Sequence, residues 1–284
     1  MSRLVTMANR LQKYASSVTP LRALTALELG AKATNTLPVR DGLPWNDFAR
    51  MYTLRLGMND PVIVAQRTGG PSYDVVFIHH CDKLSRTQIE LLQRLQHENL
   101  TTVHEIYRQH GSWHIVTEQA ARSLQEAVGN PFMDSSMIAA IIGQIVTVLV
   151  YLESQGLRHE SLTCSDILLH PTGRITLDRQ WNCVYSDTKE DIRRLGCVMM
   201  ELMDGYVKDG GSVGLDDPSR WSPEAVQFLG ATTSVSSAKE LLLHPFLASW
   251  QRAKLQGVIS LTMAWTTQSH QYIGSETVAV PDLL

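Results

Sequence analysis

Cysteine and histidine, the residues most often used as nucleophiles and metal ligands, are scattered along this chain. The four cysteines are Cys81, Cys164, Cys183 and Cys197. None is part of a CxxC pair, so their spacing predicts neither a structural zinc site nor a disulfide framework. The ten histidines are dispersed as well, and no hydrolase-type set of nucleophile, histidine and carboxylate is apparent. Zinc and hydrolase chemistry are therefore not expected.

The spacing of apolar residues predicts an α+β chain in which a small β-rich lobe precedes a larger α-helical lobe. In the first lobe it indicates strands at 61–65, 75–78, 101–108 and 113–117 and a helix at 85–96. In the second it indicates a long helix at 135–155, a small hairpin at 167–169 and 174–177, and helices at 195–202, 225–229 and 237–243.

The composition is that of an ordinary globular protein, with 284 residues, 44% hydrophobic and 19% charged. The net charge of −3 gives no reason to expect nucleic acid or an anionic membrane as the main partner. The longest apolar stretch, 137–152, is shorter than the ~20 residues that cross a bilayer, so a buried core helix is predicted and no transmembrane segment. Scattered single cysteines favour an intracellular location, in the cytoplasm.

The two ends of the chain differ from the part between them. Residues 1–44 read as a leader: the first 27 carry arginine and lysine but no acidic residue. Such a start is typical of an organellar transit peptide or of a loosely docked, flexible leader helix, and both alternatives stay open. Residues 251–284 read as a C-terminal tail.

Four strings of residues, in order, resemble the protein-kinase family, and in particular its PAK-like serine/threonine branch. They are 96–100, similar to the junction after helix C; 155–169, similar to the catalytic loop and the hairpin after it; 191–197, similar to the start of helix F; and 239–247, similar to the closing motif. The resemblance covers residues 45–250 and implies the two-lobed kinase fold, with an N-lobe at 45–118 and a C-lobe at 119–250. Helix C and the activation segment are both short.

The segment that matches the glycine loop has lost most of its glycines. Only Gly57 of the three remains, Asp60 would repel a phosphate, and Pro61 has no N–H to donate. An ordinary tight hairpin is therefore predicted where the family binds phosphates.

The lysine that grips phosphate in the family is matched by His79, a weakly basic imidazole. Its glutamate partner is matched by Gln88, so both ends of the ion pair are lost. Phe77 matches the alanine that lies against adenine, and it would fill the space of the nucleotide base.

The catalytic loop has lost its base. Ser161 matches the catalytic aspartate, and a serine hydroxyl cannot accept a proton unaided. Thr163 matches the loop lysine. Asp166 stands at the metal-binding asparagine position, either as a metal ligand or as a turn-stabilising carboxylate. Arg179 matches the metal-binding aspartate; Asp178, one residue earlier, restores a carboxylate if the register slips by one.

The matches also assign a pocket and a skeleton. The nucleotide pocket implied by the resemblance comprises Gly57, Val62, Phe77, Thr117, Glu118 and Leu168. The structural residues that the resemblance retains are Leu92, His159 and Asp191.

These losses favour a pseudokinase, a catalytically inactive kinase-like scaffold or allosteric binding protein in signalling. No cofactor is then expected, and the partner would be a protein, such as an active kinase or another signalling component. The alternative is an atypical serine/threonine kinase or nucleotide-dependent phosphotransferase that binds ATP with magnesium at Asp166 and Asp178.

Overall fold

A computed structural model describes residues 37–69 and 74–269 of the chain. Most of the predicted leader, and the tail after residue 269, lie outside the described residues. The described residues, from Leu37 onward, belong to one compact unit, and it contains the mixed α and β elements that the apolar pattern predicts.

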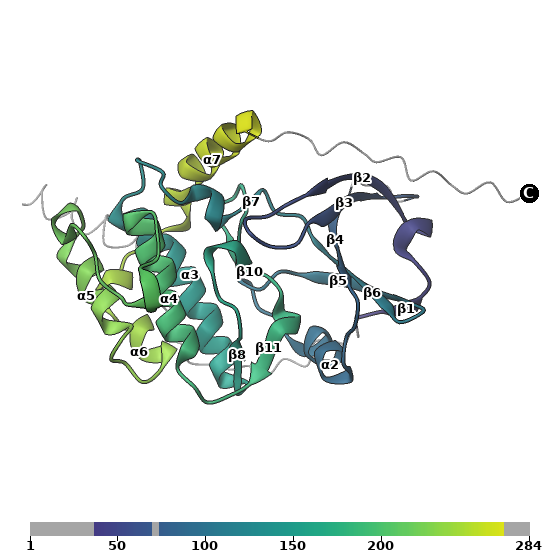
Figure 1. The fold of residues 1–284 in the computed structure, drawn as a ribbon, viewed down its shortest axis with the longest axis horizontal. Coiled ribbons are helices and arrows are strands. Elements are labelled where there is room, and N and C mark those ends of the chain that lie inside the picture. Colours follow the sequence, from purple (N-terminus) through teal and green to yellow (C-terminus); the bar gives the residue numbers. More distant parts are fainter. Residues whose placement is uncertain (1–36, 70–73, 270–284) are drawn as a thin grey trace, which may run out of the picture. The chain divides into compact units, whose positions relative to one another are not determined.

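The first part of this unit is a six-stranded sheet, with β-branched and aromatic residues along its strands (Figure 1). Its order is β1-β5-β6-β4-β3-β2. All neighbours are antiparallel except β1 and β5. The strands are β1 (Val39–Asp41), β2 (Phe48–Leu54), β3 (Val62–Arg67), β4 (Val75–Cys81), β5 (Val103–Gln109) and β6 (Ser112–Glu118).

One helix, α2 (Arg86–Arg94), accompanies the sheet. It begins at Ser85, whose side chain accepts the N–H of Gln88 while the Gln88 side chain accepts the N–H of Ser85, which is a capping box. The helix ends at Arg94, two residues earlier than the apolar repeat predicts, because Leu95 already has an extended backbone.

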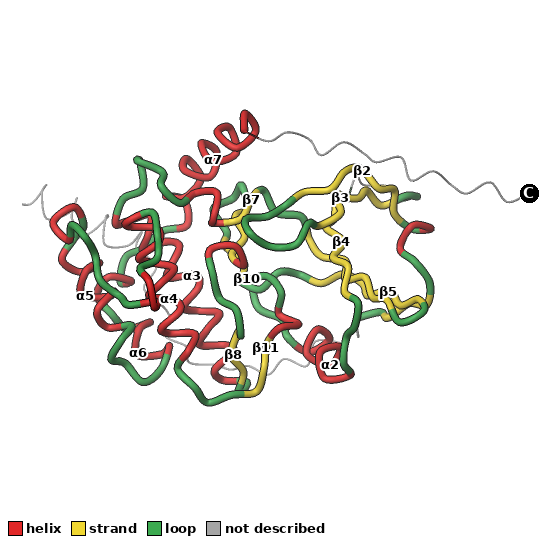
Figure 2. The backbone as a smooth tube through the Cα atoms, in the orientation of Figure 1, coloured by secondary structure: helices red, strands yellow, loops and turns green. Residues whose placement is uncertain are grey.

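The second part is helical, with short strands at its junction with the sheet (Figure 2). Its helices are α3 (Ser135–Ser154), α4 (Glu190–Asp204), α5 (Pro223–Ala231), α6 (Ala238–Leu242) and α7 (Leu255–Ser269). Two small sheets join them: β10-β9-β7, from Ile175–Leu177, Ile167–Leu169 and Arg122–Ser123, and β11-β8, from Cys183–Tyr185 and Leu157–His159.

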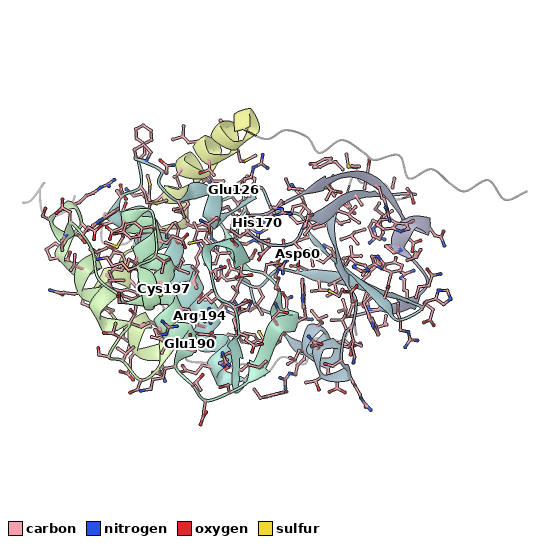
Figure 3. The ribbon with its side chains drawn as sticks, viewed as in Figure 1. Asp60, Glu126, His170, Glu190, Arg194 and Cys197 are labelled. Atoms are coloured by element: carbon pink, nitrogen blue, oxygen red, sulfur yellow. The ribbon has the colours of Figure 1, made fainter. Side chains whose placement is uncertain are left out.

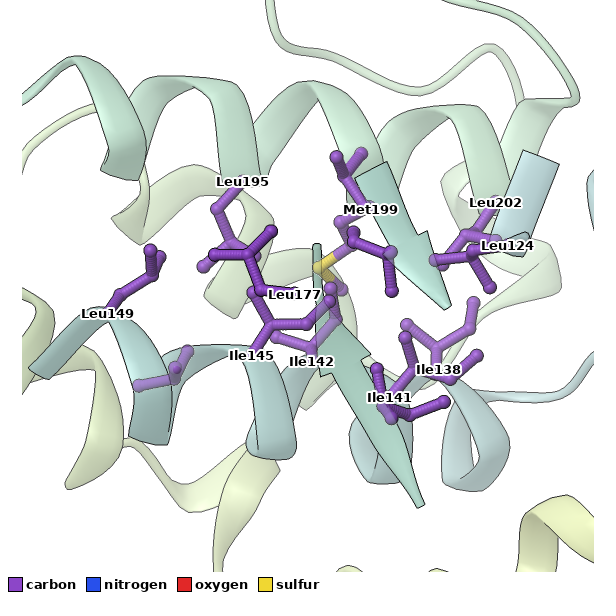
Figure 4. Packing of buried hydrophobic residues seen from close by; sticks show 14 of the residues in the cluster. Leu124, Ile138, Ile141, Ile142, Ile145, Leu149, Leu177, Leu195, Met199 and Leu202 are labelled. Carbon is purple, nitrogen blue, oxygen red and sulfur yellow. The ribbon is translucent and has the colours of Figure 1, made fainter. Parts of the chain in front are cut away.

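Helix α3 is the centre of the helical core (Figure 4). Ile138, Ile141 and Ile145 pack with residues of α4, and each is at most 1% exposed. The helix is long and apolar enough to span a membrane, but 67% of that apolar window is buried inside the fold. Buried core helices pass the same test of length and composition, so this helix is weak evidence for a membrane span.

The polar residue in the middle of α3, Gln144, is fully buried and fully hydrogen-bonded. Its amide donates to Ala140 O at 3.0 Å and to Gly173 O at 3.1 Å, and its carbonyl accepts the N–H of Ile175 at 3.0 Å. A buried amide costs little when each group has a partner. Gln144 therefore fastens the helix to the β9–β10 hairpin.

The structure extends the packed chain past both predicted boundaries. Val39 of β1 pairs with Ile106 of β5, so the end of the predicted leader belongs to the sheet. In α7, Leu255, Val258 and Ile259 are buried in the main core, so residues predicted as tail form a packed helix. The three positions follow the i, i+3, i+4 spacing of one helix face.

Candidate functional site

Three of the six residues predicted to line a nucleotide pocket meet in a buried apolar cluster. Val62 of β3, Phe77 of β4 and Leu168 of β9 pack together with Leu56, Val64 and Ala120. Phe77 is 0% exposed and Leu168 is 1% exposed. An aromatic ring and its aliphatic neighbours thus fill the space between the sheet and the β9–β10 hairpin.

The turn between β2 and β3, which matches the glycine loop, is hydrogen-bonded to the catalytic-loop match. The N–H of Met58 donates to Ser165 Oγ at 2.9 Å, and the Asn59 side-chain amide donates to Ser165 O at 2.8 Å. Turn residues Leu56–Asn59 and residue Ser165 are named here the hairpin latch. The latch joins the sheet to the helical part beside the Phe77 cluster.

Gly57 of the latch lies close against Ser165 and Ser123. A Cβ built on it would lie 2.6 Å from Ser165 Oγ and 2.9 Å from Ser123 Oγ, and its φ is +61°. Both the space and the backbone conformation therefore require glycine. The retained glycine serves a close approach between two parts of this fold.

The acid that faces Gly57 belongs to the helical part. Burial raises the pKa of the Glu126 carboxyl, and Arg122 and the N–H groups of Gly57 and Ser123 offset part of that rise. Figure 3 labels Glu126 and, in the turn itself, Asp60. Two acids beside the latch disfavour a phosphate group there.

The Asp166 carboxylate already accepts hydrogen bonds from neighbouring residues. Its Oδ2 accepts the hydroxyl of Thr163 at 2.5 Å and the N–H of the same residue at 3.2 Å. Its Oδ1 lies 3.4 Å from the Asn59 amide nitrogen. Asp166 thus stabilises a turn and the latch, which is one of the two roles predicted for it.

The side-chain carboxylate of Asp178 has fewer hydrogen bonds than that of Asp166. It is 2% exposed, and its Oδ1 has no hydrogen-bond partner. Its N–H donates to Asp166 O at 2.8 Å. Among residues 37–69 and 74–269, no three histidine, cysteine, aspartate or glutamate side chains come together as a metal site. The Asp166 carboxylate already accepts hydrogen bonds from Thr163, so only Asp178 has a free carboxylate oxygen, and one such oxygen makes a poor magnesium site.

His79 is held as a neutral, buried group. It is 4% exposed, its Nε2 lies 3.2 Å from Thr117 Oγ1, and its ring packs edge-on against Trp181. Burial lowers the pKa of His79, and Arg179 lowers it further, although Asp178 opposes the shift. Near neutral pH this position therefore carries no cation for a phosphate.

Gln88 is not joined to His79 by any hydrogen bond within the described part of the chain. Its amide donates instead to Trp181 O at 3.0 Å. Trp181 in turn packs with Leu92 of α2, which is 3% exposed. Helix α2 is therefore fastened to the segment after Asp178 by an amide and an apolar contact, where the family uses an ion pair.

The retained skeleton residues are joined through the main chain. The N–H of His159 donates to Asp191 Oδ2 at 2.7 Å, and His159 Nε2 lies 2.8 Å from Asp178 O. His159 is fully buried. His159 of β8 therefore links the start of α4, through Asp191, to the main chain at Asp178.

Comparison with known proteins gives weak similarity to kinases. The chain is 27% identical to a "Probable serine/threonine-protein kinase" of Dictyostelium discoideum over 213 aligned positions, which cover 56% of this chain and 17% of that protein. It is 24% identical to "Serine/threonine-protein kinase pakH" of the same organism, over 53% of this chain and 38% of that protein. No protein-family model matches.

The similarity supports a kinase-like family for this chain. A third Dictyostelium relative, also named "Probable serine/threonine-protein kinase", is 26% identical over 57% of this chain and 33% of its own length. The chain therefore spans less than two fifths of the length of any of these three relatives.

The remaining predicted positions lie apart from the pocket contacts. Glu118, at the end of β6, forms an ion pair with Arg174 and accepts the N–H of Thr102 at 2.8 Å. Ser161 lies partly exposed before the turn that Thr163 begins. Asn59, Ser123 and Ser165 were missed by the sequence reasoning; the retained Gly57 was the one signal that pointed toward them.

Asp191 is expected to make stability depend on pH. Burial raises its pKa to about 6, although the N–H of His159 and two arginines oppose the rise. The folded state therefore binds this proton more tightly than the unfolded state does. The contribution is complete below the unfolded pKa of 3.8 and is lost as the pH rises through about 6.

Asp191→Asn measures this contribution, because asparagine stays neutral and can still accept the His159 N–H. The unfolding free energy of the wild type minus that of the variant should fall by on the order of 2 kcal/mol between pH 4 and pH 7. Urea unfolding at several pH values checks this. Taking the difference cancels the opposite trend from His79 and His170, whose pKa values burial lowers. A difference that stays constant with pH would contradict the prediction.

Proposed function

We propose that this chain is a catalytically inactive, kinase-like protein that acts in signalling by binding other proteins, as a scaffold or allosteric partner. The observation that carries the proposal is the closed cluster around Phe77. A nucleotide base needs an apolar slot that is open to the ligand, and here an aromatic side chain of the protein fills that slot. Such a role belongs inside the cell.

The groups around the cluster support the same proposal. Phosphate binding needs a cation and free N–H donors, but His79 is neutral near pH 7 and the N–H of Met58 is donated to Ser165. No residue at the catalytic position can act as a base, because Ser161 has only a hydroxyl group. No cofactor is needed for a binding role.

One observation favours the alternative, an atypical phosphotransferase with ATP and magnesium. The Oδ1 atom of Asp178 has no partner, and Asp178 is hydrogen-bonded to the main chain of Asp166. An enzyme would still have to open the latch and stabilise the transferred phosphoryl group without the usual lysine.

Thermal unfolding with and without millimolar ATP, with magnesium or manganese, separates the two functions. We expect no shift in the midpoint, because the pocket is filled. A ligand present at about 100 times its Kd would add ~2.7 kcal/mol of stability, which is easily seen. An active protein kinase measured in the same plate is the positive control. A metal-dependent shift that Asp178→Ala abolishes would overturn the proposal.

A further inference from the structure

The six-stranded sheet ends at β1, a strand of only three residues beside β5 (Figure 1). Val39 pairs with Ile106, and Asp41 pairs with Arg108. All three residues of β1 are exposed. On its other side, β5 pairs with β6 from Val103 to Gln109. One side of β5 is thus covered along its whole length, and the other side only over a short stretch.

The side chains of β1 add little to this pairing. Val39 is 39% exposed. Arg108 Nη2 lies 2.8 Å from Asp41 Oδ1, but the two side chains are 52% and 82% exposed. An exposed ion pair contributes little, because water screens it and two long side chains must be held in place. Arg40 Nε lies 3.0 Å from Glu105 Oε2, and half of the Arg40 side chain is exposed.

The chain just before β1 is lightly attached as well. The Gln93 side-chain amide of α2 donates to Leu37 O at 3.3 Å, which is a long hydrogen bond. The Leu37 side chain is only partly buried, against the apolar cluster that includes Leu92. Removing this contact would therefore expose little apolar surface.

The buried acid beneath β1 has partners of its own. The Glu105 side chain is 8% exposed, Arg67 Nη2 lies 2.5 Å from its Oε1, and the Tyr107 hydroxyl donates to its Oε2 at 2.7 Å. A buried charge that loses its only partner is costly. Without Arg40, Glu105 would still have Arg67 and Tyr107. The departure of β1 would therefore leave no unpaired charge in the sheet.

A hinge follows β1. Gly42 has a φ of +111°, and a Cβ added to it would meet no atom within 4 Å. Beyond it, the buried Pro44 begins a short helix, η1 (Pro44–Asn46), and Phe48 of β2 is 1% exposed. The chain is thus exposed before Gly42 and packed after Pro44. A glycine with open space at such a boundary can absorb a change in chain direction.

We propose that residues 37–42, named here the β1 strap, detach from β5 as one unit by turning at Gly42 while the other five strands stay folded. Docked, the strap closes this edge of the sheet with a short strand that carries both signs of charge, which resists further pairing. Detached, it would leave the main chain of β5 open to strand pairing. The strap therefore controls access to one edge of the sheet.

Amide hydrogen exchange of the full chain, followed residue by residue by NMR, tests this. Ile106 N–H donates to Pro38 O at 3.0 Å, and Gly42 N–H donates to Arg108 O at 2.8 Å, so both amides report on the strap. The N–H of Tyr107 points to β6, because successive N–H groups of a strand alternate in direction. We expect the protection factors of Ile106 and Gly42 to agree within about threefold and to lie at least about tenfold below that of Tyr107.

A charge reversal should loosen the strap alone. Asp41→Arg puts two like charges side by side, so the protection of Ile106 and Gly42 should fall by about two- to fivefold, with Tyr107 unchanged. Adding Arg108→Asp restores an opposite-charge pair and should restore the protection. Asp216→Arg is the matched control: it reverses an exposed acid that is ion-paired with a lysine in the helical part, and it should change none of the three amides.

Three results would overturn the proposal. Equal protection of Ile106 and Tyr107 would mean that β1 opens only together with the sheet. Unequal protection of Ile106 and Gly42 would mean that the segment frays residue by residue and not as a unit. A loss of protection at Tyr107 in Asp41→Arg would mean that the opening is not local. None of these results depends on nucleotide binding, so the proposed function and this inference can fail separately.

Discussion

Phe77→Ala is expected to lower the free energy of unfolding by about 3–5 kcal/mol, which is the usual cost of removing a buried aromatic side chain. Phe77 is fully buried on β4, and it contacts residues from both the sheet and the β9–β10 hairpin. Its loss would leave a cavity where the two parts of the fold meet. Urea unfolding followed by tryptophan fluorescence measures the change.

Phe77→Leu is the matched control. Leucine keeps most of the apolar volume, so we expect a loss below about 1.5 kcal/mol. If alanine costs no more than leucine, Phe77 does not pack as the structure describes, and the argument for a filled pocket fails with it.

The same variant also tests why the pocket is closed. We expect Phe77→Ala to remain without an ATP shift, because opening the base site restores neither a cation at His79 nor free donors in the latch. An ATP shift in Phe77→Ala alone would mean that one side chain separates this protein from a nucleotide-binding one.

Much of the local structure could be predicted from the sequence, because apolar periodicity records which face of an element is buried. The i, i+4 stripe of α3 and the turn of the β9–β10 hairpin are examples. Helix α7 carries the same kind of pattern at Leu255, Val258 and Ile259. The sequence predicts a tail there because the resemblance ends at residue 250.

The contacts across the pocket could not be predicted in the same way. Asn59 and Ser165 are 106 positions apart, and no local pattern records such a pairing. A resemblance carries over positions that the family uses, so it pointed to Gly57 and Asp166 but to neither partner.

The side chains at two of the positions matched to charged kinase residues are hydrogen-bonded to neutral groups in this structure. Gln88 caps its own helix and binds Trp181 O, and Asp166 caps a turn through Thr163. Each group is satisfied by a neutral donor or acceptor, which avoids the cost of a buried unpaired charge. Arg158 and Asp191 are different, because each keeps a buried atom without a partner.

Gly57→Ala is expected to destabilise the protein through both backbone strain and a steric clash. The change puts a Cβ at a φ of +61° and within 3 Å of Ser165 and Ser123. The left-handed backbone costs alanine about 1–2 kcal/mol, and overpacking adds about 1–3 kcal/mol. We expect a total loss of about 2–5 kcal/mol in the free energy of unfolding, measured in urea.

Gly129→Ala separates the two contributions, because Gly129 has a φ of +76° but no atom within 4 Å of its added Cβ. It should lose only the backbone share, about 1–2 kcal/mol. Adding Ser165→Gly to Gly57→Ala should recover part of the packing share, since it removes the hydroxyl that the new methyl meets, although it also removes the acceptor for Met58. Equal losses at Gly57 and Gly129 would mean that the hairpin does not pack against Ser165 and Ser123 as the structure describes.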